Sequence, residues 1–211
     1  MKGEGGGMFE FLAKGGVLVT PILFCSVLAL AIFIERVIRF SVLRKRGRYV
    51  AERVATRIEG GDREGARQAA SESRSPMGRI LAQGLDVADQ DRETFETVLA
   101  HATEEEVRDL SRYLQALATI ANIAPLLGLL GTVIGMIKAF MVIQQMGGKV
   151  NAAVLAGGIW EAMLTTALGL AVALPAMVAH SWLLVQVDRY EARLQTGIVR
   201  FIKSLGRFQE S

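Results

Sequence analysis

Three long runs of apolar residues divide the sequence, and each of them lacks Asp, Glu, Lys and Arg. The runs lie at 15–34, 113–137 and 162–187. Each is long enough to cross the hydrocarbon core of a bilayer as an α-helix, which takes about 20 residues. The pattern predicts an all-α membrane protein with three transmembrane helices. Their expected bounds are 15–34, 113–138 and 157–187.

A polar stretch at 35–112 separates the first run from the second and carries most of the charge. The first membrane helix is expected to continue through about Arg53, because no Pro or Gly-Gly pair interrupts it before Gly60-Gly61. Asp62 follows that break and is a suitable N-cap for the next helix.

Further helices are expected at 63–73 and 77–87, and a long one that begins at Asp91 and leads into the second membrane helix. The remaining parts are a lead at 1–14, a short loop at 139–156 and a C-terminal helix at 188–211. The stretch at 35–112 is thus expected to be a helical extension of the membrane helices.

The distribution of Lys and Arg predicts the orientation in the membrane. The stretch from Arg36 to Arg57 has eight such residues, and the tail from Arg189 to Arg207 has five. The tail before the first run has two, Lys2 and Lys14, as does the loop after the second run. Because basic segments stay on the cytoplasmic side, the N-terminus is predicted outside, in the periplasm, and the C-terminus inside.

Composition supports a membrane protein and gives little support for an enzyme. The chain is 51% hydrophobic and 21% charged, and its net charge of +3 follows the predicted topology. The single Cys25 lies in the first run, so neither a disulfide within the chain nor a cysteine metal cluster is expected. There is no Cys/His cluster, phosphate-binding loop or nucleophile elbow, so we expect no metal, cofactor or catalytic residue.

One carboxylate interrupts the apolar pattern near the third run. Glu161 is the only Asp or Glu between Asp109 and Asp188. It follows Trp160, which lies 22 residues before Trp182, or about 33 Å along a helix. This spacing matches two aromatic belts at the membrane surfaces, and it puts Glu161 near the outer one.

Two threonines are predicted to lie at one level inside the membrane. Thr166 is about 9 Å below Trp160, and Thr132 is the same distance below Lys138, if Lys138 and Trp160 mark the same plane. Thr165 shares the helix face of Glu161, whereas Thr166 is turned away by roughly 140°. Glu161 and Thr166 therefore need not line the same surface.

Small residues and prolines accompany these polar positions. Gly128, Gly131 and Gly135 lie in the second membrane helix, and small residues favour close helix packing in lipid. Pro125 and Pro175 each remove one helix hydrogen bond.

These residues support two interpretations. Glu161 and the threonines could form an ion path, because acids in membranes usually face protein or water and hydroxyls both donate and accept. Alternatively, Glu161 reaches the outer headgroups and the threonines bond to carbonyls of their own helices.

Two sequence stretches resemble a known family. NIAPLLGLLGTVIGMIKAF in the second membrane helix and GGIWEAMLTTALGLAVALPAMV in the third are similar to the ExbB/TolQ subunits of bacterial proton-driven motors, relatives of the flagellar stator protein MotA. The resemblance implies a homopentamer in the inner membrane around a dimer of single-span ExbD- or TolR-like partners, whose aspartate carries the proton. A TonB- or TolA-like protein and phospholipid are further expected partners.

The resemblance also assigns roles to residues of this chain. Thr132 and Thr166 match the family's pore threonines, Glu161 matches its glutamate in the third helix, and Thr165 is an additional hydroxyl. The implied function is conversion of proton-motive force into work on envelope partners. The alternatives are a gliding-type motor subunit of the same superfamily and a non-conducting membrane scaffold or assembly factor.

Overall fold

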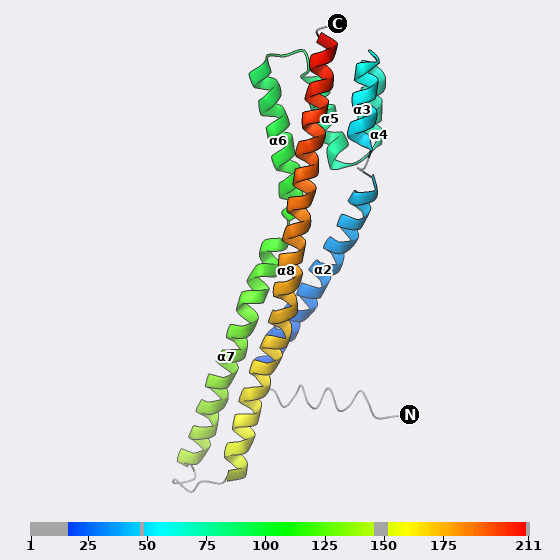
Figure 1. Ribbon diagram of the computed structural model, residues 1–211. Helices are drawn as coiled ribbons and strands as arrows, with labels where there is room; N and C mark the ends of the chain where they lie inside the picture. Colours follow the sequence, from blue (N-terminus) through cyan, green and yellow to red (C-terminus); the bar gives the residue numbers. More distant parts are fainter. Residues whose placement is uncertain (1–16, 47–48, 146–151, 210–211) are drawn as a thin grey trace, which may run out of the picture. The chain divides into compact units, whose positions relative to one another are not determined.

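The computed structural model describes residues 17–46, 49–145 and 152–209, and all regular secondary structure within these ranges is α-helical. The helices are drawn in Figure 1. Their bounds are α2 Val19–Arg46, α3 Val50–Glu59, α4 Arg63–Glu72, α5 Pro76–Asp86, α6 Arg92–Ser111, α7 Leu114–Gln145 and α8 Ala152–Gln209. The expected lead at 1–14 lies outside the described residues.

Three helical stretches are long and apolar enough to cross a membrane, as the sequence predicts. They are found within Val19–Leu43, Arg92–Gln145 and Leu155–Gly206. In the expected loop at 139–156, α7 continues to Gln145 and α8 begins at Ala152. The helices therefore extend into both ends of that stretch.

The cap expected from the sequence at Asp62 is present, and a second carboxylate caps α6. The Asp62 carboxylate accepts a hydrogen bond from the Gly65 amide at 2.8 Å, which caps α4. The Asp91 carboxylate accepts from the Thr94 amide at 2.9 Å, which caps α6. Such side-chain acceptors satisfy amides that have no partner in the first turn of a helix.

Two predictions of continuous helix are wrong. The helix that contains the first membrane span ends at Arg46 and not near Arg53, and α3 begins at Val50. The helix that begins after Asp91 does not run on into the second span, because α6 ends at Ser111 and α7 begins at Leu114. Between them, Tyr113 has a positive φ of 68°, a backbone conformation that cannot continue a right-handed helix.

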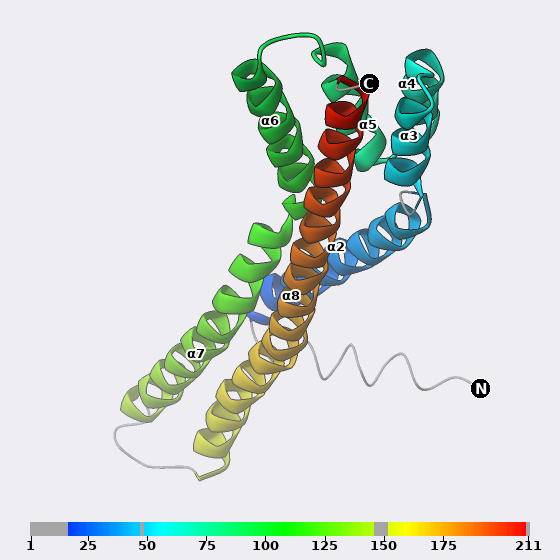
Figure 2. The same cartoon turned by 45° about the horizontal axis from the view of Figure 1, so that its top comes forward.

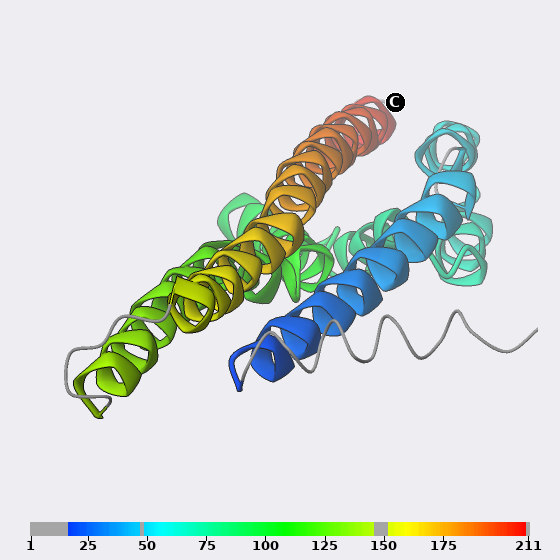
Figure 3. The ribbon, with the colours of Figure 1, turned by 90° about the horizontal axis from the view of Figure 1, so that it is seen from below.

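The chain divides into two compact units. Unit 1 contains residues up to Ile34 and Tyr113–Ser181, and unit 2 contains Glu35–Arg112 and Trp182–Ser211. Within unit 1, α7 and the first half of α8 run antiparallel and lie side by side in all three views (Figures 1, 2 and 3). Within unit 2, the last part of α8 lies beside α5 and α6 (Figures 1 and 2).

Large apolar side chains form the core of unit 2. Phe201 of α8 is completely buried, and its ring centroid lies 6.1 Å from that of Phe95 on α6. Ile58 of α3 and Ile80 of α5 are also completely buried. A Cβ on Gly84 would come within 2.9 Å of both Phe201 and Leu99, so glycine at this position makes room for the larger side chains.

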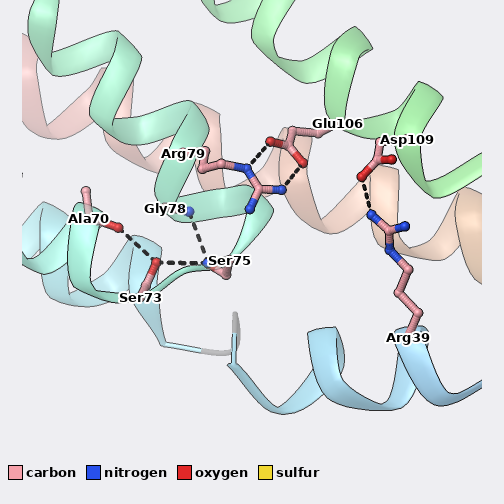
Figure 4. Close-up of polar contacts among 8 residues, drawn as sticks. All are labelled: Arg39, Ala70, Ser73, Ser75, Gly78, Arg79, Glu106 and Asp109. Atoms are coloured by element: carbon pink, nitrogen blue, oxygen red, sulfur yellow. Dashed lines mark hydrogen bonds and ion pairs between the residues drawn. The ribbon is translucent and has the colours of Figure 1, made fainter.

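Two ion pairs connect helices of unit 2, and a serine caps one of these helices, as Figure 4 shows. Arg79 of α5 binds the buried Glu106 of α6 through two nitrogens, and this carboxylate raises the pKa of the Arg79 guanidinium. Arg39 of α2 pairs with Asp109 of α6. The Ser75 hydroxyl accepts from the Gly78 amide at 3.1 Å and caps α5.

Arg36 of α2 is a fully buried charged residue at the end of α6. Its Nη1 donates to the carbonyl oxygens of Asp109 and Leu110 at 3.2 and 3.1 Å, and its Nε lies 2.7 Å from Glu35. The last carbonyls of a helix have no partner within that helix. Arg36 therefore both neutralises Glu35 and satisfies the C-terminal end of α6.

Candidate functional site

Small residues line the contact between α7 and α8 in unit 1. On each helix they recur at steps of three or four residues and are buried or half-buried. The α7 positions are Ala124, Gly128, Gly131, Gly135 and Ala139, and the facing α8 positions are Gly158, Ala162, Thr165, Gly169 and Ala173. We call this contact the seam.

The two backbones approach too closely for larger side chains along the seam. A Cβ built on Gly131 would lie 2.1 Å from the Thr165 hydroxyl, and one on Gly169 would lie 2.6 Å from the carbonyl oxygen of Ala124. A Cβ on Gly128 would come within 2.9 Å of the Thr166 Cα. Because lipid offers no hydrophobic driving force between helices, this close approach supplies the packing attraction.

The seam fixes the levels of the threonines on the two helices. Gly131 faces Thr165, and Gly135, four residues further along α7, faces Ala162, three residues earlier on α8. Thr132 follows Gly131 and Thr166 follows Thr165, so these two residues lie at nearly the same level. The levels inferred from Lys138 and Trp160 agree with this register.

Each threonine donates a hydrogen bond to a backbone carbonyl. The Thr166 hydroxyl donates across the seam to the Gly128 oxygen at 2.8 Å, whereas Thr132 donates to the Leu129 oxygen of its own helix at 2.6 Å. Both threonines are half-buried. Thr165 is only 2% exposed and donates to the Ala162 oxygen at 2.7 Å. Thr165 is thus enclosed within the seam, while Thr132 and Thr166 lie on its flanks.

An ion pair links the two helices nearer the end of the seam. The Lys138 Nζ lies 3.2 Å from the Glu161 Oε1, and the Glu161 side chain retains 29% of its exposure. This pair is not among the features predicted from the sequence, although the sequence places both residues near the outer membrane surface. Their shared level is the signal from which the pair could have been predicted, because opposite charges on neighbouring helices in a membrane usually pair.

The prolines do not end either helix. Pro125 lies inside α7 and Pro175 inside α8, and both helices continue beyond them. Pro125 follows Ala124, which faces Gly169, so the missing hydrogen bond of α7 is near one end of the seam.

Among the described residues, no group of three or more His, Cys, Asp or Glu could hold a metal ion.

Comparison with known proteins relates the chain to one family. The model of the MotA/TolQ/ExbB proton channel family matches residues 72–196, a segment that contains the seam and all four polar candidates, Thr132, Glu161, Thr165 and Thr166. The chain belongs to the MotA/TolQ/ExbB proton channel family. It is therefore an all-helical inner-membrane protein of a transport family that is not known for enzymes.

Individual relatives cover different shares of the chain. The protein named ExbB-like 1 of Synechocystis sp. is 37% identical over 80% of this chain and 67% of its own length. The biopolymer transport protein ExbB of Salmonella typhimurium is 38% identical over 52% of this chain and 46% of its own length. The Tol-Pal system protein TolQ of Haemophilus influenzae is 36% identical over 50% and 46%, respectively. This chain spans less than half the length of the latter two relatives.

Proposed function

We propose that the chain is the proton-channel subunit of an inner-membrane motor of the ExbB–ExbD or TolQ–TolR type. The observation that carries the proposal is the pair of half-buried threonines, Thr132 and Thr166, at one level on the flanks of a tightly packed seam. Two hydroxyls held at one depth by rigid helices can form part of a polar path through the hydrocarbon region.

The proposed assembly is a pentamer of this chain around a dimer of single-span partners, with the N-terminus periplasmic and the C-terminus cytoplasmic. The partner helix supplies the aspartate that takes up the proton near Thr132 and Thr166. Protonation removes the cost of burying that charge, so the partner dimer and the pentamer can move relative to each other. Release of the proton to the cytoplasm restores the charge and completes the cycle.

The threonine hydroxyls are suited to positioning the proton and not to carrying its charge. Each hydroxyl already donates its hydrogen to a carbonyl, and its oxygen keeps lone pairs that can accept from water or from a protonated carboxyl group. Lys138 pairs with Glu161 at 3.2 Å, so this carboxylate has its counter-ion on the neighbouring helix of the same chain. We therefore assign Glu161 to packing and gating at the outer end of the path.

Proton flux into liposomes that contain this chain with its single-span partner tests the proposal. Thr132→Val and Thr166→Val remove the hydroxyls with little change in size. We expect each variant to lower the proton flux by about tenfold or more, because a proton passing this level loses one polar contact. Thr196→Val is the matched control, because Thr196 also bonds a carbonyl of its own helix, but beyond the third membrane segment. Glu161→Ala is expected to change the flux less than loss of both threonine hydroxyls.

A non-conducting scaffold is the second candidate function, and one observation favours it. The hydrogens of all three threonine hydroxyls bind carbonyls of this same chain, as purely structural threonines do in membrane helices. Under this alternative, the valine variants assemble with the partner and show the same flux as wild type, or no preparation conducts under an imposed gradient. Either result would exclude the channel proposal.

A further inference from the structure

Unit 2 contains a cavity of about 150 Å³ between α2 and the part of α8 that follows Trp182. Its lining includes Val37 and Ser41 from α2, and Trp182, Gln186, Arg189 and Arg193 from α8. Phe40 and Tyr190 complete the lining. The cavity therefore has an apolar wall, three neutral polar side chains and two cations, and no acidic residue lines it. Nothing in the proposed proton path uses these residues.

The two arginines give the cavity an uncompensated positive charge. Arg189 and Arg193 are four residues apart, so they lie on the same face of α8 about one turn from each other. Within the described ranges, neither forms an ion pair, whereas Arg36, Arg39 and Arg79 of the same unit all pair with a carboxylate. A site that gathers guanidinium groups without a carboxylate is complementary to an anion, above all to a phosphate.

The position along α8 identifies the source of the anion. Trp182 lies about 33 Å along the helix from Trp160, which is one hydrocarbon thickness, and Arg189 lies about 10 Å further. On α2, the uncharged run ends at Ile34, and Val37 and Ser41 follow within about two turns. Val37 and Trp182 therefore mark the depth of the lipid headgroups, and Arg189 and Arg193 follow about 10 and 16 Å beyond Trp182. Helix side chains lean toward the N-terminus, so on α8 these two long side chains lean back toward the membrane.

We propose that this cavity binds the phosphate of an anionic phospholipid from the cytoplasmic leaflet, one lipid per chain. The assignment to that leaflet rests on the orientation in the proposed function. Arg189 and Arg193 bind the phosphate oxygens, and Gln186 and Ser41 are within the same lining to bind the remainder of the headgroup.

Native mass spectrometry of the full chain, exchanged into detergent with phosphatidylglycerol or phosphatidylcholine, tests the proposal. We expect wild type to retain one phosphatidylglycerol per chain and the double variant Arg189→Gln/Arg193→Gln to bind it at least about tenfold more weakly, as loss of charge-assisted hydrogen bonds implies. The control is Arg53→Gln/Lys203→Gln. It removes the same charge from two exposed positions of unit 2 outside the cavity.

A second variant separates the cavity from general attraction between charges. Ser41→Phe fills the space and leaves both arginines in place, so it is also expected to lose the retained lipid. It decides the question alone if the double arginine variant fails to fold, as judged by helical circular dichroism and oligomer mass. The measurement needs no proton gradient and no partner, so its outcome is independent of the flux experiment.

Three results would overturn the proposal. They are equal lipid retention by wild type and the cavity variants, equal retention of phosphatidylcholine and phosphatidylglycerol by wild type, and displacement of the lipid by inorganic phosphate at comparable concentration. The last result would assign the cavity to a soluble phosphate compound.

Discussion

The two units of this chain use the same helix, α8, in two different ways. In unit 1, α8 meets α7 through glycine, alanine and threonine, and the helix backbones come close together. In unit 2, α8 presents large side chains such as Leu194 and Phe201, which are completely or almost completely buried. Unit 2 also contains the ion pairs of Arg39 and Arg79, whereas unit 1 has the pair of Lys138 and Glu161.

The two kinds of packing are those that lipid and water favour. In water, burial of apolar area drives packing, so large side chains stabilise a core and glycine does little. In lipid, apolar side chains are equally well solvated before and after helices associate, so close backbone contact becomes the main attraction. The comparison therefore predicts opposite responses to changes in side-chain size.

The largest effect is expected from removing a large side chain in unit 2. Phe201→Ala would delete a fully buried ring and leave a cavity against Phe95 and Gly84, at a cost of about 3–5 kcal/mol in the free energy of unfolding. Chemical denaturation in detergent, followed by circular dichroism, measures it. Val199→Ala, at a position of the same helix that is 51% exposed, is the control and should change stability by less than about 0.5 kcal/mol. If both variants lose the same free energy of unfolding, Phe201 does not belong to a core that is stabilised by burial of apolar area.

Unit 1 is expected to lose stability when a side chain is made larger, and by less than unit 2 loses with Phe201→Ala. The change to test is the addition of one methyl group. Gly169→Ala would place a Cβ 2.6 Å from the backbone oxygen of Ala124, and a backbone atom cannot turn aside as a flexible side chain can. We expect a loss of roughly 1–3 kcal/mol, measured as a lower midpoint of thermal unfolding in detergent.

Gly157→Ala on the same helix is the matched control for this variant. A Cβ on Gly157 meets nothing within 4 Å, so the substitution should be neutral or stabilise by up to about 1 kcal/mol through helix propensity. If Gly169→Ala is tolerated as well as Gly157→Ala, the seam does not hold α7 and α8 at the distance described.

The sequence predicts the features that depend on composition or on local spacing. Apolar runs of sufficient length indicate the three membrane helices, and the cap at Asp62 follows from residue type and position. The break at Tyr113 was missed because the two residues between α6 and α7 include neither Gly nor Pro. The break before Val50 was missed because no Pro and no Gly-Gly pair marks it in the sequence.

Features that depend on two helices at once could not be obtained from either helix alone. The small residues of α7 indicate a packing face, but that Gly131 meets Thr165 depends on the register between the helices. The same holds for the bond from Thr166 to Gly128 and for the pair of Lys138 and Glu161. In unit 2, Arg79 and Glu106 are 27 residues apart, and nothing in their local sequence links them.

The smallest expected effect is a change of thermal stability with pH, and it tests the contribution of one charged group in unit 2. Asp62 accepts a hydrogen bond from the Gly65 amide and pairs with Arg57 at 2.7 Å, and these contacts lower the pKa of its carboxyl group below the ordinary value of 3.8. A carboxylate with a lowered pKa stabilises the folded state above its unfolded pKa, and this contribution is lost as the pH falls through the folded pKa. We therefore expect Asp62→Asn, which keeps a good N-cap, to lower the thermal midpoint slightly at neutral pH. It should converge with wild type only as the pH falls through the folded-state pKa, which lies below 3.8. Asp188→Asn, which removes the same charge from an exposed position of unit 2, is the control for the loss of one negative charge. A difference between Asp62→Asn and wild type that stays constant from neutral to acidic pH would show that the charge of Asp62 adds nothing beyond the cap itself.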